Sequence, residues 1–205
     1  MEKKPILIGL IGATGSGKTT FINTIRKRYA LEKVCIISQD EYYKPIYEQE
    51  KDVNGIENFD VAKSVDKKLL LNDLKKLLNN EEVIKAEYTF NNIEIRPKII
   101  TFKPAPIIIV EGLFVMHYKK IRELMDLKIY VHASDHLNII RRIKRDQVER
   151  GYPIDDVLYR YENHVMPGFR KYIEPYRDEA DIVINNNKGF EKSLDIFCAY
   201  LDSQI

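Results

Sequence analysis

The chain has 205 residues, and its 33 Lys and Arg residues against 31 Asp and Glu residues give a formal net charge of +2. This length suffices for one domain with a full hydrophobic core, and we expect residues 1–205 to form a single domain. The balanced charge gives no reason to expect nucleic-acid binding. No apolar run reaches membrane-spanning length, and the N-terminal apolar stretch is too short for a secretory signal. We therefore expect a cytoplasmic protein with no membrane partner.

Residues 6–11 are apolar throughout, which is typical of a strand buried on both faces of a parallel sheet. The next eight residues, Gly12 to Thr19, read G-A-T-G-S-G-K-T and match the phosphate-binding pattern G-x-x-x-x-G-K-S/T. Its glycines let backbone N–H groups surround phosphate oxygens, its lysine reaches the β- and γ-phosphates, and its hydroxyl binds Mg²⁺. A helix is expected over residues 19–30, with its N-terminus toward the phosphates. The sequence therefore predicts an ATP-type phosphate site formed by Gly12, Ala13, Thr14, Gly15, Ser16, Gly17, Lys18, Thr19 and Thr20.

Buried-strand patterns recur four more times along the chain, at residues 34–38, 107–110, 128–132 and 181–184. Helical patterns fill most intervals, over residues 61–78, 118–125, 134–149, 154–165 with continuation past Pro167, and 190–201. Alternation of this kind predicts an α/β fold with a five-stranded parallel sheet covered by helices on both faces. Residues 85–103 instead alternate apolar and polar side chains, which predicts an inserted β-hairpin.

Two carboxylates directly follow predicted strands, Asp40 after residues 34–38 and Glu111 after residues 107–110. Because the carboxyl ends of parallel strands share one edge of a sheet, both should lie near the phosphate-binding loop. Phosphoryl transfer to an alcohol needs Mg²⁺, neutralisation of the moving phosphoryl group, and a base beside the attacking hydroxyl. We interpret Asp40 as the general base, and Thr19 with Glu111 as ligands of a Mg²⁺ ion that lies beside Asp40.

A basic segment, Arg141-Arg142-Ile143-Lys144-Arg145, precedes Arg150 and Gly151. Two interpretations remain open for it. Arg142 with Asp146, Arg145 with Glu149, and Asp146 with Arg150 are spaced four apart and would form ordinary ion pairs along a solvated helix. The same arginines would also suit a lid over residues 141–167 that closes on phosphates and excludes water.

Taken in order, a series of motifs resembles the uridine/cytidine kinase family of P-loop kinases from end to end. The motifs are Gly12–Thr19, Ile37–Asp40 with Tyr43, Asn58–Asp60, Val110–Gly112, Met125–Ile129, Arg141–Asp146, Glu149–Gly151, Val165–Phe169, Ile173–Pro175 and Ala180–Ile184. The resemblance implies a P-loop kinase fold with a lid and a hairpin over the acceptor. It implies transfer of the ATP γ-phosphate to a ribose 5′-hydroxyl, a small-molecule acceptor, and a homo-oligomer.

The resemblance also assigns roles to individual residues. Lys18, Asp40 and Arg145 become catalytic residues, and Arg150 joins the phosphate-binding loop as a nucleotide contact. Thr19, Glu111 and Asp40 surround the metal. The acceptor side is assigned to Tyr43, Phe59, Asp60, Tyr88 and Arg142.

Three positions that face the acceptor depart from the family pattern. Ile93 replaces a histidine, Tyr152 replaces an arginine, and Arg160 replaces a glutamine. Because polar groups of a base would lose their partners, we expect uridine and cytidine to be poor acceptors. A one-residue shift of the hairpin would instead let Asn91 or Asn92 take the place of the histidine and retain ordinary pyrimidine recognition.

Three other functions compete with a nucleoside kinase. The first is a kinase of another small hydroxylated metabolite, as in phosphoribulokinase-like or pantothenate-kinase-like enzymes. The second is a non-catalytic nucleotide-binding protein, which would not need the base Asp40. The third is a GTPase-type switch, which is disfavoured because Asn187-Lys188-Gly189-Phe190 has phenylalanine where the guanine-reading pattern requires aspartate.

Overall fold

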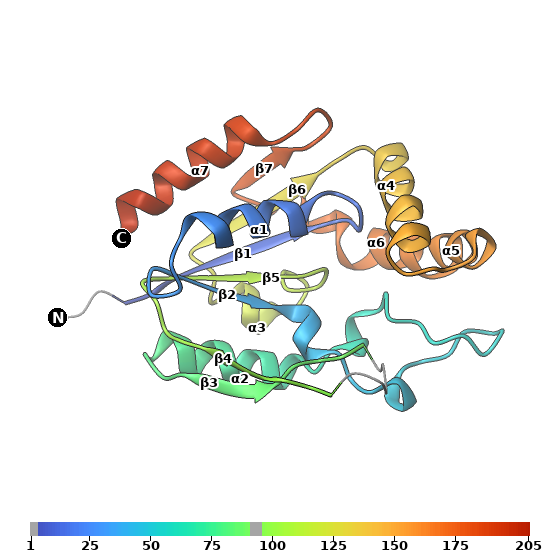
Figure 1. The fold of residues 1–205 in the computed structure, drawn as a ribbon, viewed down its shortest axis with the longest axis horizontal. Helices are drawn as coiled ribbons and strands as arrows, with labels where there is room; N and C mark the ends of the chain where they lie inside the picture. Colours follow the sequence, from blue (N-terminus) through green and yellow to red (C-terminus); the bar gives the residue numbers. More distant parts are fainter. Residues whose placement is uncertain (1–3, 91–95) are drawn as a thin grey trace.

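The computed structural model describes residues 4–90 and 96–205. Its centre is a five-stranded, all-parallel sheet in the order β2-β5-β1-β6-β7 (Figure 1). The strands are β1 (Ile6–Gly12), β2 (Val34–Ser38), β5 (Ile107–Glu111), β6 (Leu127–His132) and β7 (Ile182–Asn185). The predicted fold class is therefore confirmed, and all five strands lie within a residue or so of their expected bounds.

Helices cover both faces of this sheet, as the alternating pattern predicts. On one face, α1 (Lys18–Arg28) and α7 (Glu191–Gln204) bury Phe21, Ile25 and Phe197 against the strands. On the other face, α2 (Lys67–Leu78) and α3 (Lys119–Arg122) bury Leu74 and Ile121. The two clusters give the strands a buried environment on both sides, which explains their continuous runs of Ile, Leu and Val.

The inserted segment forms a separate two-stranded antiparallel sheet beside α2 (Figure 1). Its strands are β3 (Val83–Ala86) and β4 (Ile99–Phe102), with Val83 opposite Phe102. A hydrogen bond of 2.8 Å from Glu87 N to Lys98 O extends the pairing toward the tip. Asn91, Asn92 and Ile93, on which the two expectations for base recognition depend, lie outside the described residues.

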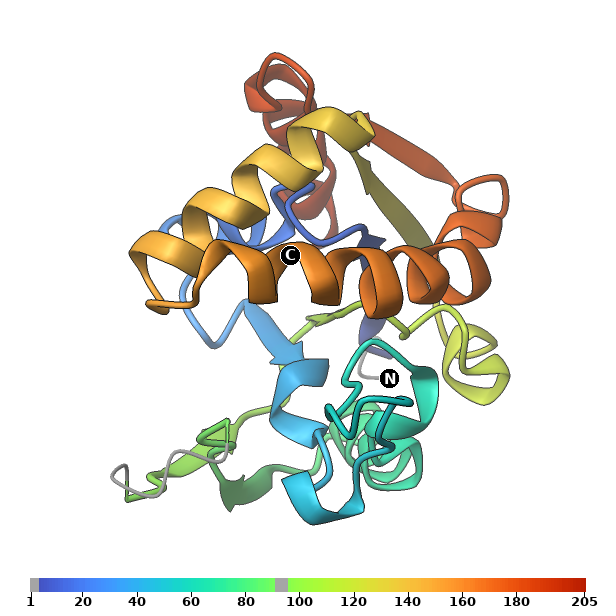
Figure 2. The same cartoon turned by 90° about the vertical axis from the view of Figure 1, so that its right-hand side faces the viewer.

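Three helical segments, α4 to α6, project beyond the carboxyl ends of the strands (Figure 2). Helix α4 spans Asp135–Val148, and α5 (Ile154–Arg160) continues through a π-helical segment (Tyr161–Val165) into α6 (Met166–Tyr172). The predicted continuation past Pro167 is therefore confirmed. Proline has no N–H to donate to a preceding carbonyl, and the wider π-helical segment ends just before it.

Two expected helices are shorter than predicted. Helix α2 begins at Lys67 rather than near Val61, because the Asp66 carboxylate accepts hydrogen bonds of 3.0 Å from the backbone N–H groups of Lys68 and Leu69. Helix α3 forms a single turn within the expected range 118–125. Asp126 ends that segment by exchanging backbone and side-chain hydrogen bonds with Leu7 of β1.

Short 3₁₀ turns also occur between these elements, at Gln39–Tyr42, Ile46–Glu48, Ala62–Ser64 and Glu174–Tyr176. The first of these carries Asp40 at the end of β2. Within the described ranges, no helix is long and apolar enough to span a membrane.

Candidate active site

The predicted phosphate-binding loop connects the end of β1 to the start of α1. Gly15 and Gly17 have φ angles of +77° and +98°, in the region that favours glycine. Added Cβ atoms would lie 2.4 Å from the carbonyl oxygen of Asn138 and 2.2 Å from Nδ2 of Asn186. Nδ2 of Asn186 donates a hydrogen bond of 2.8 Å to the carbonyl of Ser16. The loop is therefore held closely between α4 and the segment after β7.

Lys18 points back across this loop. Its Nζ atom donates hydrogen bonds to the carbonyl oxygens of Gly12, at 2.8 Å, and Ala13, at 3.1 Å. Burial lowers the pKa of Lys18, while the charges of Glu111 and Asp40 act in the opposite direction. Within the described chain, the buried Ser16 hydroxyl makes no hydrogen bond. An ammonium group and an unpaired hydroxyl in a glycine-shaped cradle are features that suit phosphate oxygens.

The two predicted carboxylates meet at one edge of the sheet. Ser38, the last residue of β2, is in register with Glu111, the last residue of β5. Its hydroxyl donates to Oε1 of Glu111 at 2.5 Å and accepts from the backbone N–H of Asp40 at 3.2 Å. Burial, and then the charge of Glu111, raise the pKa of Asp40 to about 6, against the opposing charges of Lys18 and Arg150. The charges of Glu111 and Lys18 thus both act on the ionisation of Asp40.

A buried glutamine joins the strand ends behind these carboxylates. Gln39 is fully buried, and its Oε1 accepts a hydrogen bond of 2.7 Å from the backbone N–H of Phe114. A Cβ atom on Gly112 would lie only 2.3 Å from the Cβ atom of Gln39. Gly112 is therefore required for the close approach of the two segments that carry Asp40 and Glu111.

The arginines of α4 gather around one buried carboxylate. Asp146 is 2% exposed, and its oxygens lie 3.1 Å from Arg142, 2.9 Å from Arg145 and 3.3 Å from Arg150. Two of the three ion pairs expected for a solvated helix are present, but Arg145 pairs with Asp146 instead of Glu149. The same three arginines line the cavity above the phosphate-binding loop. The two interpretations of this segment are therefore compatible.

Two further contacts connect α4 with the phosphate-binding loop. Nη1 of Arg142 donates to the hydroxyl of Thr14 at 3.2 Å, and Nη2 of Arg141 donates to the carbonyl of Asn186 at 3.0 Å. Because Asn186 in turn donates to the carbonyl of Ser16, α4 and the phosphate-binding loop share one hydrogen-bond network.

Of the acceptor residues predicted from the resemblance, Arg142 lies on α4, and the others form a second wall of the cavity. Four aromatic rings follow one another from the loop after β2 to the hairpin. Their centroids are 5.7 Å apart for Phe59 and Tyr43, 5.9 Å for Tyr43 and Tyr88, and 5.2 Å for Tyr88 and Phe90. Burial raises the pKa of Asp60 nearby, against the charge of Arg142. The wall thus combines planar apolar surfaces with a carboxyl group.

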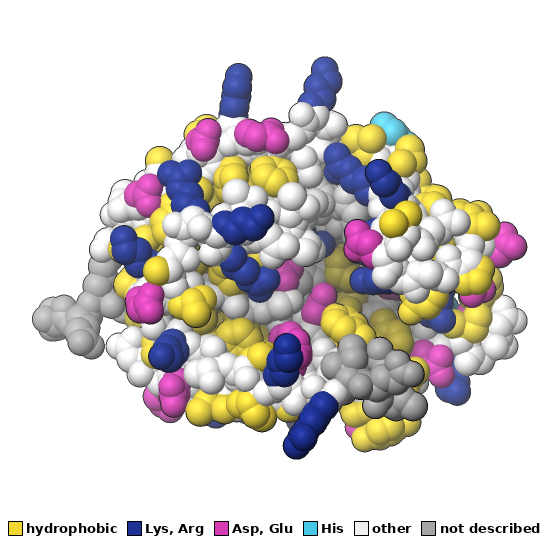
Figure 3. Space-filling model, in the orientation of Figure 1, with side chains coloured by type: hydrophobic (Ala, Val, Ile, Leu, Met, Phe, Trp, Pro, Cys, Tyr) yellow, Lys and Arg dark blue, Asp and Glu magenta, His cyan; other side chains and the backbone are white. Residues whose placement is uncertain are grey.

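Both walls enclose a cavity of about 500 Å³, a size typical of small-molecule sites. Its lining includes Lys18, Thr19, Asp40, Glu111, Asp60, Tyr88, Arg142, Arg145 and Arg150, so the structure brings the predicted residues of both substrates together. Tyr152 and Arg160, two of the positions that depart from the family pattern, also line it. The face in Figure 3 is hollowed between α4 and the body, and basic and acidic side chains both border the hollow.

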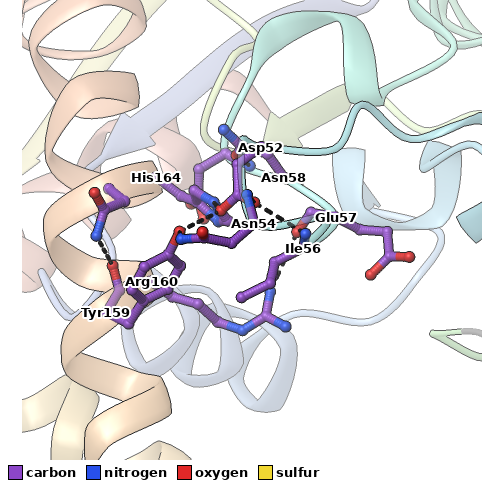
Figure 4. A network of polar contacts seen from close by, with 10 residues as sticks. Asp52, Asn54, Ile56, Glu57, Asn58, Tyr159, Arg160 and His164 are labelled. Atoms are coloured by element: carbon purple, nitrogen blue, oxygen red, sulfur yellow. Dashed lines mark hydrogen bonds and ion pairs between the residues drawn. The ribbon is translucent and has the colours of Figure 1, made fainter.

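A polar network centred on Asp52 joins the two walls (Figure 4). Asp52 Oδ2 accepts a hydrogen bond of 2.7 Å from the Tyr159 hydroxyl and lies 2.8 Å from Nε2 of His164, while Oδ1 accepts from the backbone N–H groups of Asn54 and Ile56. Nη1 of Arg160 donates to the carbonyl of Glu57 at 3.2 Å. The loop that leads to Asp60 is therefore attached to α5 and to the π-helical segment.

Sequence reasoning missed several residues that shape this site. Arg141 belongs to the basic segment, so its sequence position was a usable signal. Ser38 and Gln39 adjoin Asp40, but nothing in their residue types indicates their partners across the sheet. Asp146 was predictable in part, because its pairs with Arg142 and Arg150 follow from their spacing of four residues, whereas its contact with Arg145 does not. Asn186 contacts Ser16 from a segment far away in the chain, and a single sequence contains no pattern for such a contact.

Comparisons with known proteins agree with this geometry. Residues 7–189 match the model of the phosphoribulokinase/uridine kinase family. The chain is 37% identical, over 205 residues that cover 100% of it and 98% of the relative, to a uridine kinase from Clostridium tetani (strain Massachusetts / E88). It is 38% identical over 200 residues to a uridine kinase from Clostridium perfringens (strain SM101 / Type A), covering 96% of this chain and 95% of that one.

A solved structure shows the same fold. The phosphoribulokinase from Rhodobacter spheroides aligns with a TM-score of 0.63 and 21% identity, covering 89% of this chain and 70% of that one. The family match and the full-length relatives show that this chain belongs to the phosphoribulokinase/uridine kinase family, whose members are P-loop phosphotransferases that act on a hydroxyl group.

Proposed function

We propose that this protein transfers the γ-phosphate of ATP to the 5′-hydroxyl of a nucleoside, with uridine and cytidine as the first acceptors to test. The observation that carries the proposal is that Asp40, Lys18 and Glu111 share one cavity with the row of rings Phe59, Tyr43, Tyr88 and Phe90. Planar rings suit a nucleobase, whereas phosphorylated sugars and polyols have no flat apolar face to stack. The full-length relatives named uridine kinase support the same acceptor class.

On the donor side, the loop Gly12–Thr20 would bind the triphosphate through its backbone N–H groups, with Lys18 at the β- and γ-phosphates. Arg145 would neutralise charge on the moving phosphoryl group, and Arg150 would bind the nucleotide. These arginines already lie at the cavity wall, held by Asp146. This arrangement provides the charge neutralisation that phosphoryl transfer requires.

Thr19, Glu111 and Asp40 would hold Mg²⁺. In the described ranges no three or more His, Cys, Asp or Glu side chains form a group that could hold a metal ion. This suits Mg²⁺ in kinases, which takes one or two carboxylates together with substrate phosphates and water. When bound, the ion would neutralise charge on the β- and γ-phosphates.

On the acceptor side, Asp60 and Tyr43 would hold the ribose. Tyr88 and Phe59 would contact the base, and Arg142 would line the acceptor site from α4. Asp40 would then accept the proton of the 5′-hydroxyl. With a pKa raised to about 6, its carboxylate form predominates at neutral pH and still has appreciable basicity. The expected cytoplasmic location and homo-oligomer stay predictions.

Release of ADP from ATP and Mg²⁺, measured against a panel of acceptors, tests this function. We expect release with uridine or cytidine and none with 5′-deoxyuridine, which keeps the base and ribose ring but lacks the attacked hydroxyl. Lys18→Ala should abolish release in every case. Release with ribulose 5-phosphate or pantothenate but not with any nucleoside would show that the acceptor class is different.

A further inference from the structure

The stem of the β3–β4 hairpin is attached to the turn that carries Asp40. Nζ of Lys85 donates a hydrogen bond to the backbone carbonyl of Glu41 and lies 3.5 Å from the centroid of the Tyr42 ring. Three residues further along, the backbone N–H of Tyr88 donates to Oε2 of Glu41 at 2.8 Å. The hairpin thus contacts the two residues that directly follow the predicted base.

The turn is fixed independently from its other side. Tyr42 is 2% exposed, and its hydroxyl donates to the buried Asp73 carboxylate of α2 at 3.0 Å. Its backbone carbonyl accepts a hydrogen bond of 2.8 Å from the N–H of Asp66. The hairpin has less support, because two strands of four residues each are marginally stable alone. The core holds the start of β3 and the end of β4, where Val83 is buried and Phe102 packs against the same cluster. Contacts with the turn therefore act on the part of the hairpin that leads to Tyr88.

The location of the hairpin matters because Tyr88 and Asp40 both line the cavity. Lys85 and Glu41 are not among the residues that line it. Their effect on an acceptor would therefore pass through Tyr88 on one side and Asp40 on the other. A charged hydrogen bond and a cation–π contact are among the stronger side-chain interactions, so together they can hold a short ribbon in one position.

We propose that Lys85 and Glu41 are positioning residues that dock the hairpin onto the Asp40 turn and thereby set the acceptor hydroxyl at a fixed distance from Asp40. This inference rests on the proposed function in assigning an acceptor to the space beneath the hairpin. The docking contact itself is independent of that assignment, so the two can be tested separately.

Hydrogen exchange of the backbone amide of Tyr88 tests the docking without any substrate. Lys85→Met keeps most of the aliphatic stem and removes the ammonium group, and Glu41→Ala removes the carboxylate that accepts this N–H. Lys98→Met and Glu82→Ala make the same changes at exposed positions of the hairpin segment. We expect exchange to become about tenfold faster in the first pair and to stay unchanged in the controls.

Steady-state kinetics test the positioning role. Lys85→Met should lower kcat/KM for the acceptor by about 10–100-fold and leave the KM for ATP within about twofold, since only the acceptor geometry changes. Lys85→Arg, which keeps a cation over Tyr42, should recover most of the loss.

Variants with unchanged Tyr88 exchange would overturn the docking. Faster exchange with kinetics like those of the controls would overturn the positioning role. A rise in the KM for ATP as large as the change in kcat/KM for the acceptor would overturn it as well. If the wild-type protein phosphorylates no nucleoside, the proposed function fails, but the exchange experiment still decides the docking.

Discussion

Asp40 occupies an environment that disfavours its charged form. Burial and the charge of Glu111 raise the pKa of this carboxyl from 3.8 to about 6. A catalytic base with a pKa slightly below the working pH combines ionisation with useful basicity. The chain therefore accepts an unfavourable charge at the position where we propose that a proton is removed from the acceptor.

The pKa of Asp40 predicts a pH profile. We expect kcat/KM for the acceptor to rise tenfold per pH unit below about pH 6 and to level off above it, because only ionised Asp40 can accept the proton. Asp40→Asn should lower kcat by about 10²–10⁴ and remove this step. A variant that loses ATP affinity while keeping its kcat would instead show that Asp40 is not the base and serves only the metal or the structure.

The same shift predicts that Asp40→Asn stabilises the fold. Because the pKa is higher in the folded protein than in the unfolded chain, the wild type loses stability as pH rises from about 3.8 to 6. The neutral variant should therefore gain up to about 3 kcal/mol at pH 7 and nothing below pH 3.8. Urea unfolding across this range measures it, with exposed Asp178→Asn as control. A variant that is less stable at pH 7 would contradict the prediction.

At the scale of elements, α4 depends on one internal carboxylate. Asp146 compensates three arginines, of which Arg142 is 11% exposed and Arg150 is 48% exposed. Asp146→Asn should lower the free energy of unfolding by about 1–3 kcal/mol, since Arg150 and Arg145 remain partly hydrated. It should also reduce kcat more than it raises either KM, because the arginines lose their common anchor.

Thermal unfolding and steady-state kinetics check this prediction, with Glu149→Gln on the exposed side of the same segment as control. A destabilised Asp146→Asn protein with normal kcat would show that these ion pairs serve only the helix.

The Asp52 network joins the loop leading to Asp60 with the helix after α4. Burial would raise the pKa of Asp52, but hydrogen bonds from Tyr159, the Ile56 N–H and His164 together lower it. A depressed pKa means that the carboxylate stabilises the fold above about pH 4, and that this contribution disappears as pH falls.

Asp52→Ala should therefore lower Tm by a few degrees at pH 7 and at pH 5, and by less only below about pH 3, where the carboxylate begins to lose its contribution. It should raise the acceptor KM several-fold and leave the KM for ATP unchanged, because the loop carries acceptor residues. Differential scanning calorimetry and kinetics measure both effects, with exposed Asp155→Ala as control. Equal changes in both KM values would place the effect on the whole fold instead.

At the scale of the molecule, the sheet and the phosphate-binding loop were predictable from local patterns. Continuous apolar runs mark strands buried on both faces, and the glycine spacing marks a backbone that must surround phosphate. Asp40 and Glu111 could be placed together because parallel strands share one carboxyl edge. Alternation, a local property, indicated an inserted hairpin and placed β4 within it, but β3 begins at Val83, two residues before the predicted range of 85–103.

Features that depend on contacts between distant segments were not predictable. The hydrogen bond from Asn186 to Ser16 and the row of rings from Phe59 to Phe90 both require the folded chain, whereas the pairs of Asp146 with Arg142 and Arg150 follow from their spacing. Predicted helix boundaries were wrong where a side chain accepts hydrogen bonds from backbone N–H groups, as Asp66 does at the start of α2.

Steady-state kinetics with uridine test the central claim most directly. If the cavity holds a nucleoside with its 5′-hydroxyl at Asp40, uridine should be converted to its 5′-monophosphate with kcat/KM above about 10⁴ M⁻¹s⁻¹, within the normal range of enzymes. A value this high would also show that the departures at Ile93, Tyr152 and Arg160 do not make uridine the poor acceptor that the sequence alone predicts. A value below about 10² M⁻¹s⁻¹ for uridine and cytidine, together with a normal value for an alcohol that has no base, would contradict the nucleoside assignment.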